Sequence, residues 1–408
     1  MTTLTATAAD SVRGACEDVR DGTPDSTVDG VPVGIVARPG STDQVAGVLK
    51  AAASHGLTVV PRGRGTKLTW GCPPASADLV VDLSAMDRVL DHAAGDLIVA
   101  TQAGTRLADL QRVVGQGGQR LVLDETVPGA SIGGTLSTNA SGPERVLGGT
   151  ARDLLIGVTV VRADGVVAKA GGRVVKNVAG YDLGKLMIGS FGTLAIVTEA
   201  LFRLHPVPEE RRWVSVTVED TAAAGDLAQA LVHSQTVPGA VEVDAPADGR
   251  LTVTALFAGR ADGVTARAES ALALLGAAST VTSQQPAGWT SYPWEAGETG
   301  LKLTCALSGV GEVLAAAAEV GARVRGSAGA GVLHAALAAP DAVPAALERL
   351  RATCTRNRGT AVVVDGPPEV KRTVDVWGPV PGLDLMRRVK DRFDPDHRLA
   401  PGRFVGGI

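Results

Sequence analysis

A short loop that follows an apolar run has the residue types that bind phosphate groups. The loop, residues 61–67, reads Pro-Arg-Gly-Arg-Gly-Thr-Lys and comes after a predicted strand over residues 57–60. Its glycines allow successive backbone N–H groups to point at one ligand, and Arg62, Arg64 and Lys67 add positive charge. A pyrophosphate accepts many charge-assisted hydrogen bonds of this kind, so the loop suits that ligand. From this loop alone, a solvated basic turn is an equally good interpretation.

Two common nucleotide-binding motifs are absent from the sequence. Gly63 and Gly65 begin a G-x-G pattern, but Leu68 stands where a dinucleotide fingerprint needs its third glycine. No G-x-x-x-x-G-K-[ST] segment occurs anywhere in the chain, which excludes a P-loop.

A second glycine-rich segment, residues 128–142, has small hydroxyl and amide side chains that suit a polar cofactor. It lies in a stretch, residues 124–149, for which the sequence predicts a long functional loop without regular periodicity. Gly129 to Gly133 matches the hydrolase pattern G-x-S-x-G, with Ser131 at its centre. A nucleophilic serine of that kind stands between a core strand and a helix, so the position of Ser131 inside a loop argues against a nucleophile.

The third segment, residues 171–206, joins a polar turn to a glycine-punctuated apolar strand. We expect Asp182 to cap a short helix and Gly189 to end that helix in a left-handed conformation. Gly189 and Gly192 then allow the backbone to approach a flat or bulky group, which we interpret as a flavin ring.

Composition and charge exclude several classes of protein. The chain has 408 residues and a net charge of −4, and no run of Lys and Arg is dense enough to suggest binding to nucleic acid. Residues 1–22 lack the apolar segment of a signal peptide, and no uncharged apolar run reaches the roughly 18 residues that span a bilayer. We therefore expect a soluble, cytoplasmic protein.

Cysteine and histidine spacings argue against metal sites on this chain. The four cysteines are far apart and form no C-x-x-C pair, so neither a disulfide framework nor a Cys-ligated iron–sulfur cluster is expected. A cluster that receives electrons would then sit on a partner. None of the six histidines lies at metal-ligand spacing from another, which disfavours zinc. The residues concerned are Cys16, Cys72, Cys305, Cys354, His55, His92, His205, His233, His334 and His397.

Hydrophobic periodicity predicts two regions of different character. In the first, a strand, a helix and a strand span residues 33–60, and a hairpin spans residues 155–170. In the second, the order strand, helix, strand, strand, helix, strand occurs twice, over residues 213–283 and 301–364. We interpret this repetition as a duplicated ferredoxin-like domain, an antiparallel sheet covered by helices. A last helix is predicted over residues 383–392.

Three segments together resemble the FAD-binding domain of the PCMH type, the domain of the vanillyl-alcohol oxidase and p-cresol methylhydroxylase family. They are residues 61–66, 128–142 and 189–199. The resemblance implies that the first holds the pyrophosphate of FAD, that the second lies along the diphosphate and the flavin, and that the third passes the ring. The tail, residues 393–403, resembles the closing motif of the family, except that Ala400 replaces its usual Asn.

The resemblance implies an α+β fold with a two-part FAD-binding domain of the PCMH type and a ferredoxin-like antiparallel cap domain. Some members attach FAD through a histidine in the first loop, where this chain has Arg64 and Thr66, so we expect non-covalent FAD. The predicted parts are a polar N-terminal segment at residues 1–30, the FAD-binding domain at 31–208, the cap domain at 209–366, and a C-terminal segment at 367–408 that returns to the FAD-binding domain.

The same resemblance implies a set of cofactor-binding residues, whereas it assigns no catalytic residue and no metal ligand. The expected contacts of FAD are Pro61, Arg62, Gly63, Arg64, Gly65, Thr66, Pro128, Gly129, Ser131, Gly133, Gly134, Thr138, Asn139, Ser141, Gly142, Gly192 and Ile196.

Residues 176–190 resemble one group of that family more closely, the GlcE-type subunits of bacterial glycolate oxidase. Residues 176–183 read Lys-Asn-Val-Ala-Gly-Tyr-Asp-Leu and carry most of this likeness. It implies a complex that oxidises glycolate, a 2-hydroxyacid, to glyoxylate and passes electrons to an iron–sulfur partner. The implied partners are a homologous FAD-containing catalytic subunit and an iron–sulfur subunit, with peripheral membrane association through the complex. A generic flavoprotein turn is the alternative interpretation.

One segment departs from the family pattern. Flavin-dependent 2-hydroxyacid dehydrogenases of this family carry G-H-A-G-D-G-N-L-H in the cap, whereas this chain has Ser327, Ala330 and Val332 in place of His, Asp and Asn. A serine without an activating partner is no base, and alanine offers no carboxylate. Only His334 remains, so we expect the chain to bind FAD without the usual hydroxyacid site.

Two alternatives stay open at the level of sequence. One is a self-sufficient FAD-dependent oxidoreductase that acts on another 2-hydroxyacid or on an alcohol. The other is a non-catalytic assembly subunit whose flavin site is vestigial, although a vestigial site need not keep two glycine-rich segments.

Overall fold

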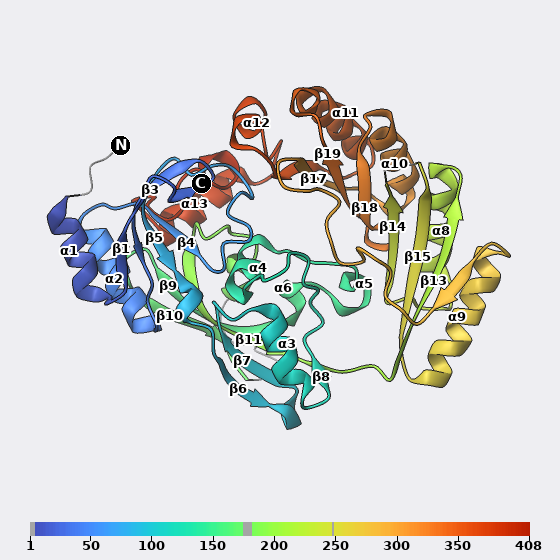
Figure 1. Ribbon diagram of the computed structural model, residues 1–408, viewed down its shortest axis with the longest axis horizontal. Helices are drawn as coiled ribbons and strands as arrows, with labels where there is room; N and C mark the ends of the chain where they lie inside the picture. The colour runs from blue at the N-terminus through green and yellow to red at the C-terminus, as the bar shows by residue number, and fades with distance from the viewer. Residues whose placement is uncertain (1–4, 174–181, 247–248) are drawn as a thin grey trace. The chain divides into compact units, whose positions relative to one another are not determined.

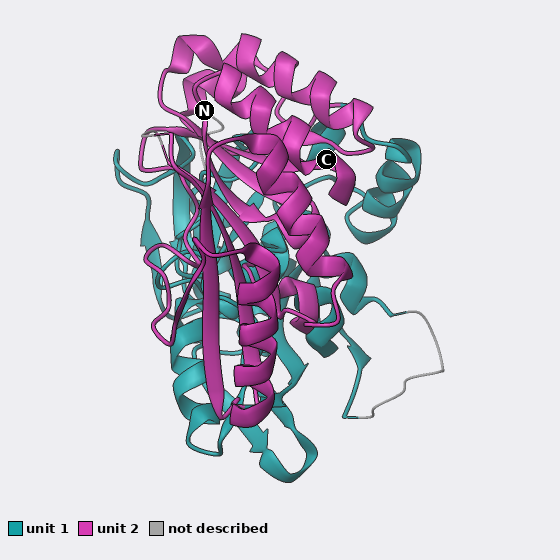
Figure 2. Ribbon diagram, turned by 90° about the vertical axis from the view of Figure 1, so that its right-hand side faces the viewer, with its two compact units in different colours: residues 1–140, 150–206, 379–408 teal, residues 141–149, 207–378 magenta. Residues whose placement is uncertain are grey.

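The computed structural model describes residues 5–173, 182–246 and 249–408 (Figure 1). The chain divides into two compact units (Figure 2). Unit 1 comprises residues 1–140, 150–206 and 379–408, and unit 2 comprises residues 141–149 and 207–378. The sequence had suggested boundaries after residues 208 and 366. In the structure, residues 141–149 group with unit 2, and the chain re-enters unit 1 at Pro379.

The first sheet of unit 1 has the strand order β1-β3-β5-β4, with β2 paired to β3. Strands β3 and β4 flank β5 and run parallel to it, whereas β1 and β2 run antiparallel to β3. The predicted strand–helix–strand unit is therefore confirmed, with β5 inserted between its two strands. The elements are α1 (Ala6–Ala15), β1 (Val19–Asp21), β2 (Thr27–Val28), β3 (Val31–Ala37), α2 (Thr42–Ser54), β4 (Val59–Arg62) and β5 (Ala77–Asp82).

Helix α2 forms because its sequence supplies both a cap and an apolar face. The Ser41 hydroxyl accepts a hydrogen bond from the backbone N–H of Gln44 at 3.2 Å, which satisfies one free donor of the first turn. Val45, Val48 and Leu49 lie on one side of the helix and are fully buried.

The second sheet of unit 1 is antiparallel and has the order β10-β9-β11-β7-β6. The predicted hairpin over residues 155–170 is confirmed by the pairing of β9 with β10. Its elements and the helices around it are β6 (Val89–Ala93), β7 (Ile98–Gln102), α3 (Leu107–Gly115), α6 (Ala151–Leu154), β9 (Leu155–Arg162), β10 (Val167–Gly171), α7 (Gly184–Met187), β11 (Ala195–Arg203) and α13 (Leu383–Phe393). A small separate pair joins β8 (Gln119–Arg120) and β12 (His205–Pro206).

The prediction of a long loop over residues 124–149 is wrong in part. Helix α4 spans Ile132–Thr138, and a short helix α5 spans Arg145–Gly148. The Gly, Ser and Thr residues of α4 are poor helix formers, so propensity gave no signal. Tertiary burial decides instead, because Ile132 and Leu136 are almost completely buried in the core.

The predicted cap of the next helix is also wrong. Leu183, and not Asp182, precedes the first turn of α7, and no side chain caps that helix. Gly189 does adopt the expected left-handed conformation, with φ of +75°.

Unit 2 is built on one eight-stranded antiparallel sheet with the order β16-β13-β15-β14-β18-β19-β17-β20. The predicted repetition is confirmed, because each half has the same element order and strand neighbours. The two halves join edge to edge through β14 and β18. Figure 1 shows the four long helices on one face of this sheet. The elements are β13 (Glu210–Val218), α8 (Thr221–His233), β14 (Ala240–Ala245), β15 (Leu251–Gly259), α9 (Ala261–Leu275), β16 (Thr280–Thr282), β17 (Thr299–Thr304), α10 (Val310–Glu319), β18 (Arg323–Ser327), β19 (Val332–Leu337), α11 (Val343–Arg356), β20 (Ala361–Asp365) and α12 (Pro368–Thr373).

A buried ion pair fastens the C-terminal segment inside unit 1. The side chains of Lys390 and Asp394 are completely buried, and their N–O distance is 2.7 Å. The Lys390 ammonium also donates to the backbone carbonyls of Thr193 at 2.7 Å and Leu399 at 3.0 Å. Burial lowers the pKa of Lys390, and the Asp394 carboxylate opposes that shift. One ammonium group therefore joins α13, the turn before β11 and the C-terminal segment.

The segment after α13 pairs with the strand that leads into the glycine-rich loop at residues 61–67. The N–H of Val59 in β4 donates to the carbonyl of Arg398, and the N–H of Ala400 donates to the carbonyl of Val59, each at 2.8 Å. Ala400, which replaces the usual Asn of the family motif, therefore contributes a backbone hydrogen bond to β4.

Substitution of Asp394 by Asn tests the energetic role of this pair. Removing one partner of a buried pair leaves an uncompensated charge and typically costs about 3–5 kcal/mol. We therefore expect D394N to lower the free energy of unfolding by about 3 kcal/mol in urea denaturation. The control is D384N on the same helix, where the Asp384–Arg387 pair is solvent-exposed and should contribute less than about 1 kcal/mol. Equal urea midpoints for D394N and D384N would contradict this account.

Candidate functional site

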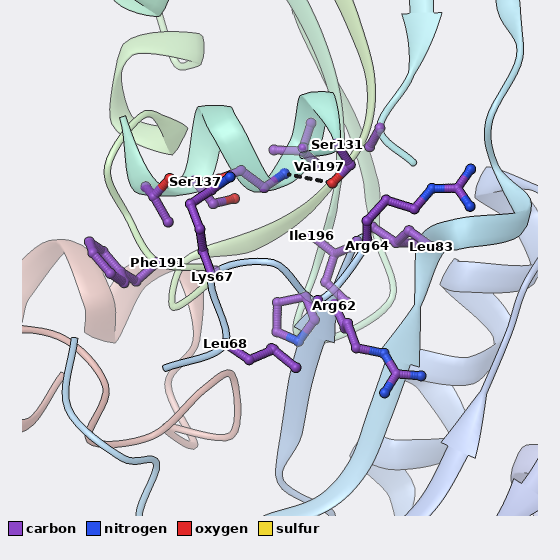
Figure 3. Close-up of a pocket in the computed structure, with 18 of the residues that line it drawn as sticks. Arg62, Arg64, Lys67, Leu68, Leu83, Ser131, Ser137, Phe191, Ile196 and Val197 are labelled. Atoms are coloured by element: carbon purple, nitrogen blue, oxygen red, sulfur yellow. Dashed lines mark hydrogen bonds between the residues drawn. The ribbon is translucent and has the colours of Figure 1, made fainter. Parts of the chain in front are cut away.

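One cleft in unit 1 is lined by residues that are far apart in the sequence (Figure 3). The lining comes from the loop after β4, from α4, from the turn before β11 and from the C-terminal segment. Of the predicted cofactor contacts, the cleft contains Pro61, Arg62, Gly63, Arg64, Gly65, Thr66, Ser131, Gly133, Gly134, Thr138, Gly192 and Ile196.

The other predicted contacts do not line this cleft. Pro128 and Gly129 precede α4, and Asn139 ends that helix in a left-handed conformation with φ of +49°. Ser141 and Gly142 group with unit 2. Their glycine-rich and small polar character resembled that of the true lining residues, so the sequence alone could not separate them.

Glycines allow the lining segments to touch. A Cβ on Gly63 would lie 2.0 Å from the Ser131 Oγ, and a Cβ on Gly192 would lie 2.4 Å from the Pro61 ring. There is therefore no room for a side chain at Gly63 or Gly192, and the backbone itself forms this wall of the cleft. Ser131 caps α4 by accepting a hydrogen bond from the Gly134 N–H at 3.3 Å, a structural role in keeping with the prediction against a nucleophile.

The two arginines of the loop each form an ion pair within the fold, and their expected part in phosphate binding stays a prediction. Arg62 forms an ion pair with Asp82 at 2.7 Å, and Arg64 forms one with Asp87 at 3.1 Å. Figure 3 shows both guanidinium groups extending to the side of the loop opposite to Lys67. Their charges are thus neutralised within the protein.

Two other cations line the cleft and form no ion pair within 4 Å among the described residues, although Glu125 lies near Lys67 and Asp29 near Arg403. Lys67 is 8% exposed, and burial lowers its pKa to about 8, against a smaller opposing effect of Glu125. Arg403 is 4% exposed, and burial lowers its pKa to about 10. Its Nη2 donates to the carbonyls of Leu68 and Trp70 at 2.8 and 2.7 Å. Its Nη1 is buried and finds no hydrogen-bond partner among the described residues.

This arrangement fits the pyrophosphate of FAD. A buried guanidinium nitrogen without an acceptor and a buried ammonium with a lowered pKa both gain from an anion placed between them. The N–H groups of the glycine-rich loop add donors without side-chain bulk. Lys67, Arg403 and the backbone of residues 62–66 would therefore hold the diphosphate.

The apolar part of the cleft suits a planar ring. Leu83, Ile196 and Val197 contribute aliphatic side chains, and Phe191 lies at the edge, stacked on Phe404 with 5.7 Å between ring centroids. Most of these residues were missed from the sequence. Phe191 and Val197 lie inside the recognised segment at residues 189–199, and the tail motif contains Arg403. These two motifs could therefore have identified the three residues from the sequence.

The turn with the most specific resemblance, residues 176–183, lies mostly outside the described residues. Lys176 and Tyr181 are among those not described, and the expectation attached to them stays a prediction. Asp182 is exposed, and Leu183 is partly buried.

A second group of cations gathers in unit 2. Lys302 in β17 and His334 in β19 are directly opposite each other on neighbouring strands, and Arg145 of α5 lies near both. Burial, assisted by Arg145, lowers the pKa of Lys302 to about 8 and that of His334 well below its usual value. The Tyr292 ring packs edge-on against His334, with 4.7 Å between centroids. Within the described ranges Lys302 has no carboxylate partner, so this group attracts an anion.

The sequence identified only His334 of this group. Lys302 and Arg145 lie in no motif and come together through strand pairing and the placement of residues 141–149. Ser327, at the position of a family histidine, is buried at the end of β18, and its Oγ finds no partner in the part of the chain that is described.

Two negative findings concern the described ranges alone. Residues 5–173, 182–246 and 249–408 contain no group of three or more His, Cys, Asp or Glu side chains placed to hold a metal ion. The helices in these ranges are all too short or too polar to cross a membrane.

Comparison with known proteins agrees with the geometry of the cleft. Residues 33–171 match the sequence model of the FAD binding domain family. Glycolate oxidase subunit GlcD of Bacillus subtilis is 33% identical over 213 residues, which are 52% of this chain and 45% of that protein. D-2-hydroxyglutarate dehydrogenase of Xanthomonas citri pv. viticola is 37% identical over 174 residues, 42% of this chain and 37% of that protein. The chain thus spans less than half the length of these relatives.

A solved structure extends the likeness to nearly the whole chain. An alkyldihydroxyacetonephosphate synthase superposes with a TM-score of 0.70 at 16% identity, covering 91% of this chain and 77% of that one. At this identity the likeness concerns the fold alone. It confirms the predicted α+β fold, in which a PCMH-type FAD-binding domain is combined with an antiparallel cap domain.

Lys67 should make FAD binding depend on pH. Only the protonated ammonium attracts the diphosphate, and in the free chain its pKa is about 8. Affinity should therefore be constant below about pH 7 and fall by up to tenfold per unit as the pH rises beyond 8. Fluorescence titration of FAD should show that K67M binds more weakly at pH 7 and has lost this dependence. R403M should bind FAD more weakly than the wild type at every pH from 6.5 to 9. The pKa of Arg403 is about 10, so the wild-type side chain is charged throughout this range. An unchanged pH profile in K67M would disprove the assignment.

The close approach of Gly63 to Ser131 can be tested by a paired substitution. G63A places a methyl group 2.0 Å from the Ser131 Oγ and should abolish FAD binding. In G63A/S131A that oxygen is absent and the nearest remaining atom, Cβ, lies at 3.1 Å, so part of the FAD content of the purified protein should return. G95A is the control, since nothing lies within 4 Å of its Cβ position. Normal FAD content in G63A would contradict the proposed packing.

Proposed function

We propose that this chain is the FAD-binding, GlcE-type subunit of a glycolate oxidase complex, in which glycolate is oxidised to glyoxylate and electrons pass to an iron–sulfur partner. The observation that carries the proposal is the cleft of unit 1, with its glycine-walled backbone and the buried Arg403 Nη1, which has no hydrogen-bond partner among the described residues. The match of residues 33–171 to the FAD binding domain supports it. So do the two relatives named for oxidation of 2-hydroxyacids.

Bound FAD supplies a two-electron acceptor for the oxidation of a hydroxyl-bearing carbon. The protein contributes binding and orientation through Lys67, Arg403 and the loop backbone. No histidine lines the cleft in the described part of the chain, so we propose that FAD is held without a covalent bond.

The cations of unit 2 support a substrate with a carboxylate. Arg145, Lys302 and His334 come from three separate segments, and the described residues near Lys302 offer no acid to neutralise it. A small 2-hydroxyacid brings one carboxylate and one hydroxyl group, which suits two cations and a neutral imidazole. This modifies the expectation that the chain lacks a hydroxyacid site, because a different residue set can take that role.

The cysteines support an electron acceptor on another chain. Burial raises the pKa of Cys305 to about 11 and that of Cys354 to about 12, and both thiols are poor ligands in that state. We therefore propose an iron–sulfur subunit and a homologous FAD-containing subunit as partners. The complex would act in the cytoplasm, with membrane contact through its partners.

A self-sufficient 2-hydroxyacid oxidoreductase is the second candidate. The cation group of unit 2 favours it, because a chain that binds both FAD and a carboxylate substrate would hold both reactants of the oxidation itself. The non-catalytic alternative is weakened by the same observation.

Anaerobic reduction of the bound flavin separates these candidates. We expect the FAD-loaded chain alone to keep its oxidised spectrum with glycolate, and the complex reconstituted with both partner subunits to bleach. In that complex, K302M should raise the KM for glycolate by about tenfold or more with unchanged FAD content. K302R keeps a cation at this position, so its KM should lie between those of the wild type and K302M. K50M, at an exposed lysine of α2, is the control.

Three results would change the assignment. Bleaching of the isolated chain by glycolate or D-2-hydroxyglutarate would establish the second candidate. A chain that takes up no FAD would leave only the assembly role. A complex in which K302M changes nothing would remove Lys302 from substrate binding.

A further inference from the structure

Unit 1 contains a second cavity, which shares no lining residue with the cofactor cleft. Its volume is about 160 Å³. The walls come from one face of β9 and β10, from α7 and from the last turn of α13. Neither FAD binding nor the cations of unit 2 gives this cavity a role.

The floor of the cavity consists of four apolar side chains, which the register of two paired strands places side by side. Val160 of β9 pairs with Ala168 of β10, and Val158 pairs with Ala170. Because side chains alternate along a strand, these four point to the same face of the sheet. The two alanines leave room above them that larger residues would fill.

The sides of the cavity are also apolar. Met187 of α7 is buried at 1% exposure, and Phe393 of α13 is partly buried against the core. The apolar part of this lining offers few polar partners, and a bound water needs two to four of them. An apolar cavity of about 150 Å³ accommodates a benzene ring, so a ring or a short aliphatic chain fits the space.

The rim, in contrast, is cationic. Arg162 follows Val160 on the same face of β9, and Arg392 reaches the cavity from α13. No Asp or Glu is among the lining residues that the structure describes. Arg162 forms an ion pair with Asp164 through Nη2 at 2.8 Å, whereas its Nε is buried and has no hydrogen-bond partner in the described ranges. Arg392 has no carboxylate partner within those ranges either.

We propose that this cavity binds a small amphipathic monoanion, an aryl or short-chain aliphatic carboxylate, with its apolar body on the β9–β10 floor and its carboxylate at Arg162 and Arg392. Planar guanidinium groups suit a carboxylate because they donate two hydrogen bonds in a fixed fork. The apolar floor alone would accept any hydrophobic fragment. The orphaned Arg162 Nε selects an anionic one.

Calorimetric titration of the FAD-loaded full chain tests the proposal with benzoate and hexanoate as probes. Benzyl alcohol and hexanol are the matched neutral probes. We expect each carboxylate to bind at one site at least tenfold more tightly than its alcohol. The same titrations in K302M exclude binding at the cations of unit 2, and unchanged affinity there is expected.

Two kinds of variant locate the bound probe. R162M and R392M should each weaken carboxylate binding about tenfold while leaving alcohol binding unchanged. A168L, which fills the floor, should abolish binding of both probes, and its circular dichroism and FAD content should match the wild type. The control is R112M, at an exposed arginine of α3 that forms an ion pair with Asp109 three positions earlier.

Several results would overturn the proposal. It fails if the alcohols bind as tightly as the carboxylates, if binding is lost in K302M, or if R162M and R392M both bind normally. It also fails if neither probe binds and A168L instead prevents co-purification with a partner subunit, since the occupant would then be a partner side chain. None of these outcomes bears on FAD binding, so the proposed function is tested separately.

Discussion

The cofactor cleft depends on a buried ion pair that lies behind it. Lys390 and Asp394 are removed from water completely, and a buried ion pair of this kind is stable only when further hydrogen bonds support it. The ammonium finds three, and one of them is the Thr193 carbonyl, 197 positions earlier in the chain. Through this single group, the C-terminal segment, the turn before β11 and, by way of Leu399, strand β4 are held at fixed distances. The cleft is the space that these held segments leave open.

The cations of the cleft have two different roles: some form ion pairs within the protein, and others are proposed to bind the ligand. Arg62 and Arg64 line the cleft, but their ion pairs with Asp82 and Asp87 bind them into the fold and fix the path of the loop. Lys67 and Arg403 are buried with too few acceptors, which is unfavourable in the free chain and favourable once an anion is present. Unit 2 repeats this division, since Arg325 pairs with Asp244 on neighbouring strands while Lys302 stays without a carboxylate among the described residues. Buried cations that form no ion pair among the described residues thus mark the proposed binding sites in both units.

The sequence predicted those features that local rules determine. Glycine spacing identified the loop at residues 61–66 and the turn at residues 189–199, because close backbone approach leaves few alternatives to glycine. Alternating hydrophobicity identified the duplicated half of unit 2. Features that arise from tertiary packing were not predictable, among them α4, whose Gly and Thr residues are helical only because Ile132 and Leu136 are buried. The same is true of Lys390, Arg145 and Lys302, which belong to no motif and acquire their partners from distant segments.

The central claim is that FAD occupies the cleft formed by the loop after β4, α4 and the turn before β11. Hydrogen–deuterium exchange of the full chain with and without FAD tests it most directly, because backbone N–H groups form much of the proposed wall. We expect slower exchange on FAD binding at residues 62–68, 132–138 and 191–197, with little change in β13 to β16. Unchanged exchange in these three segments in a chain that demonstrably binds FAD would contradict the account.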